Sequence, residues 1–198
     1  MNLSSSQRIG IFAVLALIMA ATRFHHFAAV PDASWAVFFV AGFYLRGSAR
    51  WAFPLLVALA VLVDFLVITN QGLNFWTHYC VSPAYWFLLP SHALLWAGGS
   101  WLRARYRGPG LPALGLLVVA FVLATSASFV LSNGSFYWLS DVVATRSFGG
   151  WLKNLGDWYL AYLATTAGYV AIAASAHVIG ALLVRKPTLP PQQTAPRG

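Results

Sequence analysis

Acidic residues are scarce in this sequence: it contains no glutamate and four aspartates, and charged residues make up 8% of its 198 positions. Soluble domains carry about 25% charged residues, so the soluble class is excluded. There is one cysteine, Cys80, which excludes an internal disulfide and leaves a buried thiol, a link to another chain or a reactive free thiol. The sequence also lacks HExxH, Walker, GxSxG and CxxC patterns, so the enzymes that these motifs define have no support.

What the sequence has in abundance is apolar surface. Hydrophobic residues make up 60% of the chain, aromatic residues 16%, and the mean hydropathy is +0.71. These values indicate an integral, multi-pass membrane protein of the all-α class. Six apolar segments meet or approach the roughly 20 residues that a membrane-spanning helix needs. The predicted spans are about Gln7–Phe27, Ser34–Leu45, Trp51–Asn70, Pro83–Leu102, Leu111–Leu131 and Asp157–Val184.

These segments predict a single six-helix transmembrane domain over residues 1–186, followed by a disordered tail over 187–198 that is rich in Pro, Gln and Thr. The second segment is short, so it would tilt, re-enter the membrane or include flanking residues. The first segment also has the pattern of a cleaved signal peptide, but we expect it to be retained as a helix.

The basic residues lie in the gaps between the apolar segments. The net charge of +8 would indicate nucleic-acid binding in a soluble protein, but here it is typical of a topology signal, and we expect no nucleic-acid partner. One side of the membrane would collect Arg8, Arg46, Arg50, Arg103, Arg105, Arg107, Arg185, Lys186 and Arg197, and the other Arg23, Arg146 and Lys153. The ratio of nine basic residues to three predicts that both termini are cytoplasmic and that Cys80 faces the exterior.

Three gaps would then face outward, namely Arg23–Ala33, Gln71–Ser82 and Ser132–Gly156. The last is the longest and is rich in aromatic residues, so it would lie in the interface as an aromatic belt or fold over a pocket as a lid. The stretch Asn74–Trp86 places Cys80 among aromatic rings, hydroxyls and His78. A thiolate is a soft metal ligand and a strong nucleophile, and His78 would help to deprotonate it.

Several other residues leave alternatives open. Asp64 lies within an apolar segment, where it would serve as a hydrogen-bond acceptor at a pocket floor, a protonatable site, or a protonated side chain bonded to a neighbouring helix. His25 and His26 are better explained as solvated interface residues than as metal ligands. Ser100 and His177 would form the pair of an intramembrane serine hydrolase, and a structural membrane subunit without a ligand is a third class of function.

The sequence resembles the BtuM family of vitamin B12 transporters, which look like substrate-binding S-components of energy-coupling factor (ECF) transporters. The resemblance covers the six-helix layout with both ends inside and the single cysteine before the fourth helix. Its specific part is Asp64, the run Cys80-Val-Ser-Pro-Ala-Tyr85, and Gly156-Asp157-Trp158 at the end of the outer gap.

The resemblance implies that the chain binds cobalamin and takes it up across the inner membrane, with Cys80 as axial ligand of the cobalt. Thiolate coordination would also assist decyanation of cyanocobalamin. Ala16-x-x-x-Ala20 looks like the small-residue face by which S-components dock on an ECF coupling module, although the sequence leaves open whether such a module exists. The predicted ligand-binding residues are Cys80, Asp64, Asn74, Trp76, Tyr79, Tyr85 and Arg146, since aromatic faces suit a broad macrocycle and polar groups its amides and phosphate.

Overall fold

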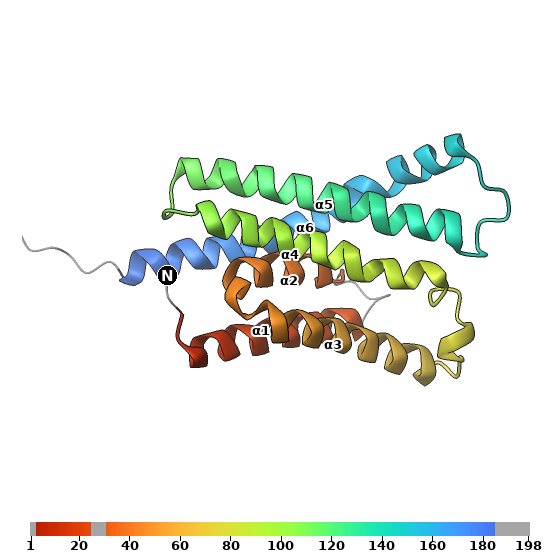
Figure 1. Ribbon diagram of the computed structural model, residues 1–198, viewed down its shortest axis with the longest axis horizontal. Helices are drawn as coiled ribbons and strands as arrows, with labels where there is room; N and C mark the ends of the chain where they lie inside the picture. The colour runs from red at the N-terminus through yellow and green to blue at the C-terminus, as the bar shows by residue number, and fades with distance from the viewer. Residues whose placement is uncertain (1–2, 25–30, 185–198) are drawn as a thin grey trace, which may run out of the picture.

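The computed structural model describes residues 3–24 and 31–184, and this part of the chain is helical and contains no strand (Figure 1). His25 and His26 lie outside the described residues. The helices are α1 (Ser5–Phe24), α2 (Ser34–Tyr44), α3 (Ala49–Asn70), α4 (Leu88–Arg105), α5 (Leu111–Leu139) and α6 (Phe148–Val184). Three short 3-10 helices join them, η1 (Arg46–Ser48), η2 (Phe75–Thr77) and η3 (Pro83–Phe87). The prediction of six helices in an all-α fold is confirmed.

Four of the described helical segments are long and apolar enough to cross a membrane. They cover Ser5–Phe24, Arg46–Asn70, Leu111–Leu139 and Phe148–Leu183. α2 has 11 residues and therefore rises about 16 Å, well short of the roughly 30 Å hydrocarbon core. α4 has 18 residues but carries Arg103 and Arg105 in its last turn.

The short helix α2 forms the centre of the bundle. Every residue from Ser34 to Phe43 is buried, and the helix packs along α4 and also contacts α1, α3 and α6. Phe39 meets Phe121 of α5 edge-on, and Phe38 stacks on the His92 ring of α4 at 4.1 Å. Because α2 has neighbours on all sides, its sequence is apolar all round rather than amphipathic.

Glycines allow α2 and α4 to approach each other closely. A Cβ atom added to Gly99 of α4 would collide with the backbone carbonyl of Phe39, and one added to Gly42 of α2 would collide with that of Trp96. A backbone carbonyl cannot move aside as a flexible side chain can. The glycines at this crossing therefore set the distance between the two helices, as expected for small residues in membrane bundles.

Gly99→Ala is expected to destabilise the fold, because its methyl group would push α2 and α4 apart. The expected loss is about 1–3 kcal/mol, the usual cost of overpacking a core. Thermal unfolding of the full chain in detergent measures it. Gly115→Ala is the matched control, since Gly115 lies in α5 with open space around its Cβ position. Equal melting temperatures for the two variants would contradict the close approach.

The predicted outer gap Ser132–Gly156 is mostly helical, so the prediction of one long loop is wrong. α5 continues to Leu139, α6 begins at Phe148, and only residues 140–147 connect them. The Ser132 and Ser135 hydroxyls donate to carbonyls three residues earlier in α5, at 3.4 and 2.9 Å. Asn133 donates to the Asn154 side-chain oxygen at 2.7 Å and so joins α5 to α6. Polar residues that predicted a loop instead connect two helices, and Gly156-Asp157-Trp158 lies within α6.

Candidate functional site

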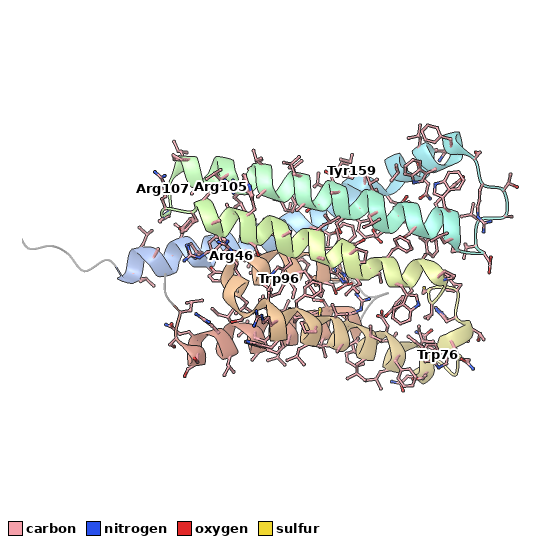
Figure 2. The ribbon with its side chains drawn as sticks, in the orientation of Figure 1. Arg46, Trp76, Trp96, Arg105, Arg107 and Tyr159 are labelled. Carbon is pink, nitrogen blue, oxygen red and sulfur yellow. The ribbon has the colours of Figure 1, made fainter. Side chains whose placement is uncertain are left out.

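The bundle has two chemically different ends, which we name the Trp76 end and the Arg46 end after residues labelled in Figure 2. Arg105 and Arg107 lie toward the Arg46 end, while η2 and the connection between α3 and α4 form part of the Trp76 end (Figures 1 and 2). The predicted cysteine site therefore lies opposite the arginine-rich end.

The stretch Asn74–Trp86 is held in place by two short 3-10 helices. The Asn74 side chain accepts a hydrogen bond from the Trp76 backbone N–H at 2.9 Å and so caps η2, and Pro83 begins η3. Phe75 and Tyr85 are buried against Ile68 of α3. Exposed aromatic side chains flank the cysteine along this stretch: Trp76 is 71% exposed, Trp86 62% and Tyr79 55%.

Cys80 is a free, partly buried cysteine in this stretch. Burial raises the pKa of its thiol above the usual range, a hydrogen bond from Tyr79 acts in the opposite direction, and the negative charge of Asp64 raises it further. The thiol is therefore protonated at neutral pH. The Nδ1 atom of His78 accepts the Cys80 backbone N–H at 3.3 Å, so this nitrogen is used to shape the turn rather than to deprotonate the thiol.

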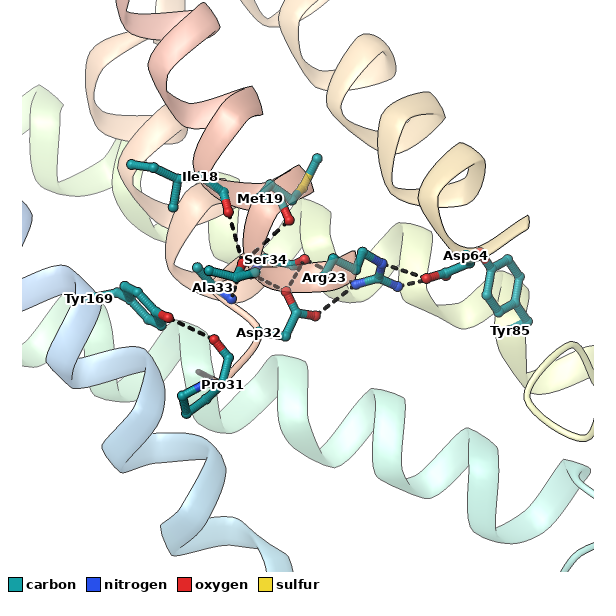
Figure 3. Close-up of polar contacts among 11 residues, drawn as sticks. Ile18, Met19, Arg23, Pro31, Asp32, Ala33, Ser34, Asp64, Tyr85 and Tyr169 are labelled. Atoms are coloured by element: carbon teal, nitrogen blue, oxygen red, sulfur yellow. Dashed lines mark hydrogen bonds and ion pairs between the residues drawn. The ribbon is translucent and has the colours of Figure 1, made fainter. Parts of the chain in front are cut away.

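Asp64 takes part in a partly buried ion pair (Figure 3). The Arg23 guanidinium of α1 donates from Nε to Asp64 Oδ1 at 2.6 Å and from Nη2 to Oδ2 at 2.7 Å. The Tyr85 hydroxyl of η3 donates to the same Oδ2 at 2.7 Å. Bidentate, charge-assisted hydrogen bonds of this kind are among the strongest in proteins. Of the alternatives that the sequence left open for Asp64, the structure shows a hydrogen-bond acceptor and a side chain that is bonded to a neighbouring helix.

A second branch of this network reaches the start of α2. Arg23 Nη1 donates to Asp32 Oδ2 at 2.8 Å and to the Ser34 hydroxyl at 3.0 Å, and the Ser34 backbone N–H donates to Asp32 Oδ1 at 2.9 Å. We call Arg23, Asp32, Ser34, Asp64 and Tyr85 the Arg23 network. It ties α1, α2, α3 and η3 together in the half of the bundle nearer the Trp76 end.

Sequence reasoning treated Arg23 only as a topology signal and so missed its role. The sequence does contain a signal for this role. A charged side chain within the membrane is energetically costly, and an arginine and two aspartates in or beside apolar segments lower this cost when they pair. Arg23 is 8% exposed, which leaves its charge dependent on these carboxylates.

The Cys80 thiol lies within electrostatic range of the Arg23 network. Electrostatic interactions connect it with Asp64 and Arg23, and connect the Tyr162 hydroxyl of α6 with Cys80, Asp32 and Arg23. The structure thereby brings together Cys80, Asp64, Tyr79 and Tyr85 from the predicted set. Arg146 instead donates to the Ser140 carbonyl at 2.8 Å in the connection between α5 and α6, and Asn74 serves as a cap.

Ser100 and His177 are not paired, which corrects the serine hydrolase alternative. The Ser100 hydroxyl donates to the Gly42 carbonyl at 3.0 Å. His177 lies between two tyrosines, with Nδ1 at 2.7 Å from the Tyr44 hydroxyl and Nε2 at 2.7 Å from that of Tyr106. Both nitrogens of the proposed base are therefore occupied, and its proposed nucleophile is bonded to the backbone.

The described residues contain no group of three or more His, Cys, Asp or Glu side chains that could hold a metal ion. Cys80 thus offers a single soft ligand from residues 31–184 and is not part of a chelating cluster. A lone thiolate suits a metal that carries its other ligands with it, because a bare transition ion is normally held by several protein donors.

Together, the helices and the charge distribution define an all-helical protein with four helices suited to crossing a membrane, the class of helical membrane proteins. No protein-family model matches the chain, and no curated protein matches it.

Proposed function

We propose that this chain is a cobalamin-binding uptake protein of a bacterial inner membrane, similar to S-components of ECF transporters, with Cys80 as axial ligand of the corrinoid cobalt. The observation that carries the proposal is the placement of one partly buried thiol among exposed aromatic faces, beside the Arg23 network. A corrin ring fills the equatorial positions of cobalt, so a single protein donor is sufficient. Trp76, Tyr79 and Trp86 offer apolar surface to the broad macrocycle.

The proposed topology has six spans, both termini cytoplasmic and the Trp76 end outward. The nine-to-three distribution of basic residues supports this orientation. α2 is short and α4 carries two arginines in its last turn. Both would cross within the bundle, where α2 is shielded from lipid by its neighbours. An ECF-type coupling module would dock on α1 through Ala16 and Ala20, both of which are partly exposed.

Cys80 would also assist removal of cyanide from cyanocobalamin. The thiol would lose its proton, and its sulfur would take the axial position given up by the nucleotide base of cobalamin, which weakens the cobalt–cyanide bond on the opposite face. Two molecules of an external thiol reductant would supply one electron each to two Co(III) centres, giving two Co(II) and one disulfide, and each cyanide would leave with its bonding pair. The chain supplies only the sulfur ligand in this scheme.

The test of this proposal is the visible spectrum of the purified protein after exposure to cyanocobalamin. Thiolate coordination changes the corrinoid absorption, so the parent protein should be coloured and its spectrum should differ from that of free cyanocobalamin. Cys80→Ala should lose this difference. A colourless parent protein would favour a structural membrane subunit, and an unchanged corrinoid spectrum in Cys80→Ala would rule out axial ligation.

Corrinoid affinity is expected to rise with pH. Because the pKa of the Cys80 thiol is raised, the thiol is protonated at neutral pH, and coordination must release that proton. Below the pKa, the apparent affinity should increase by up to about tenfold per pH unit, and it should level off above the pKa. Equilibrium titrations with aquocobalamin between about pH 5 and about pH 7, below the range in which the cobalt-bound water itself loses a proton, measure this slope. Cys80→Ala should remove the slope, whereas a flat profile in the parent would contradict thiolate binding.

A further inference from the structure

An apolar cavity lies between four helices toward the Arg46 end of the bundle. Its volume is about 140 Å³, and its walls come mainly from apolar side chains of α2, α4, α5 and α6. Tyr106 lines it and stands in the sequence between Arg105 and Arg107, which Figure 2 labels toward that end. An apolar cavity of about 150 Å³ is large enough to hold one benzene-sized molecule. The volume therefore fits a single aromatic ring.

Aromatic rings form one part of the cavity wall. The Phe43 ring meets the rings of Tyr44 and Tyr106 edge-on, with centroids 5.0 and 5.3 Å apart. It meets the His177 ring in the same way at 5.7 Å, and all four residues line the cavity. Edge-on contacts are a preferred arrangement of aromatic pairs, and an aromatic ligand can add a further contact of this kind. The wall therefore favours an aromatic ring over an alkyl chain.

The same part of the wall offers a hydrogen-bond donor. His177 Nδ1 lies 2.7 Å from the Tyr44 hydroxyl, and its Nε2 lies 2.7 Å from the Tyr106 hydroxyl. A neutral imidazole accepts at one nitrogen and donates at the other, and an imidazolium donates at both. In either state, at least one tyrosine accepts from the ring and keeps its own hydroxyl hydrogen. An oxygen atom of a ligand can accept that hydrogen at the edge of the cavity.

A polar cavity of about 430 Å³ adjoins this edge. The two cavities share Phe43, Tyr44 and Tyr106 in their walls. A small molecule can therefore place its apolar ring in one cavity and its polar group at the junction with the other. A charge would be costly to bury among apolar side chains, whereas a hydroxyl that is hydrogen-bonded to a tyrosine is not. These features favour an uncharged ligand with one ring and one hydroxyl.

We propose that the apolar cavity binds a molecule of the phenol class, with its ring beside Phe39, Leu117 and Ala174 and its hydroxyl at Tyr44 or Tyr106. The ligand oxygen accepts the hydrogen that the tyrosine keeps, and burial of the ring among apolar side chains contributes the rest of the binding free energy. The proposal goes beyond cobalamin binding and does not depend on it, because Cys80 lies toward the opposite end of the bundle.

The test uses the full-length protein, delipidated in detergent and titrated with 4-fluorophenol, while fluorine NMR follows the bound probe. The parent should show saturable binding in addition to partition into the micelle. Ala174→Phe places a ring in the cavity and should abolish the saturable part. Ala176→Phe is the matched control, because Ala176 is exposed on the same helix and does not line the cavity. Ala113→Leu fills the same cavity from α5 and replaces Ala174→Phe if that variant does not fold.

A second probe tests the hydrogen bond separately from the ring. The double substitution Tyr44→Phe with Tyr106→Phe removes both hydroxyls and keeps the rings. It should weaken binding of 4-fluorophenol by about two- to tenfold, the usual net effect of one hydrogen bond, and leave binding of fluorobenzene unchanged. 1-Hexanol, which has a hydroxyl but no ring, should displace 4-fluorophenol only weakly.

Four outcomes would overturn the proposal. The first is binding of 4-fluorophenol that does not saturate in the parent, and the second is equal binding by Ala174→Phe and Ala176→Phe. The third is a double variant that weakens both fluorinated probes equally, since the tyrosine hydroxyls would then play no part. The fourth is displacement of 4-fluorophenol by an equal concentration of 1-hexanol, which would show that the cavity takes an alkyl chain.

Discussion

Arg23→Met is expected to lower the free energy of unfolding by about 3–5 kcal/mol, the range found when one partner of a buried ion pair is removed. The substitution leaves Asp32 and Asp64 in a partly buried site without their cation, and their side chains are only 20% and 17% exposed. Thermal or denaturant unfolding of the full chain in bicelles measures the change. Double substitution of Arg23 and Asp64 by apolar residues should recover part of the loss, because it removes a buried charge together with its partner.

Lys153→Met is the matched control, because it removes an ion pair of the same length that is exposed to solvent. Lys153 and Asp157 are also 2.6 Å apart, as are Arg23 and Asp64, but their side chains are 77% and 49% exposed. An exposed pair contributes less than about 1 kcal/mol because water screens it. The two ion pairs have the same length, so the larger loss of unfolding free energy expected for Arg23→Met should come from burial. Similar losses for Arg23→Met and Lys153→Met would show that the Arg23 network is solvated.

Under the proposed function, Cys80→Ala is expected to weaken cobalamin binding by more than about 10- to 100-fold. That range is the usual cost of losing an outer-shell partner of a metal, whereas this substitution removes the proposed axial ligand itself. Isothermal titration with aquocobalamin measures the change. Cys80→Ser should fall close to Cys80→Ala, since a hydroxyl is a much harder and weaker ligand than a thiolate.

A corrinoid with blocked axial positions tests whether the loss comes from the cobalt bond. Cobinamide in excess cyanide carries cyanide on both faces of the metal, so Cys80 has no free position to occupy. Parent and Cys80→Ala proteins should then bind it equally. A variant that still binds the dicyano form more weakly than the parent would show that Cys80 acts through packing instead.

The lengths of the apolar segments predicted the bounds of the helices well where polar residues mark the end of a segment. α3 ends at Asn70 as predicted, and the fourth predicted segment corresponds to η3 followed by α4. The same reasoning failed at α5, because serine and asparagine were taken to end a helix. The Ser132 and Ser135 hydroxyls instead donate within α5, and the Asn133 side-chain N–H donates to Asn154 of α6. Such pairing depends on which helix lies opposite, and local sequence does not contain that information.

The candidate site was predictable to a similar degree. A single thiol among aromatic residues is visible in the sequence, and so is an acid at membrane depth. The partner of Asp64 was not identified, because Arg23 lies 41 positions away and only the packing of α1 on α3 brings them together. Ser100 and His177 show the reverse error, since two reactive residue types were paired although the fold gives each a different partner.

The central position of α2 has a consequence for how any solute could cross. Phe38 and Phe39 are at most 1% exposed, so α2 fills the centre of the described bundle and leaves no open path along its axis. Hydrogen bonds from the Arg23 network hold the first turn of α2 in place. A molecule held at the Trp76 end would stay on that side until the surrounding helices separate from α2. Passage through this chain would then be a conformational step on the microsecond to millisecond scale of collective helix motions, not diffusion through a standing pore.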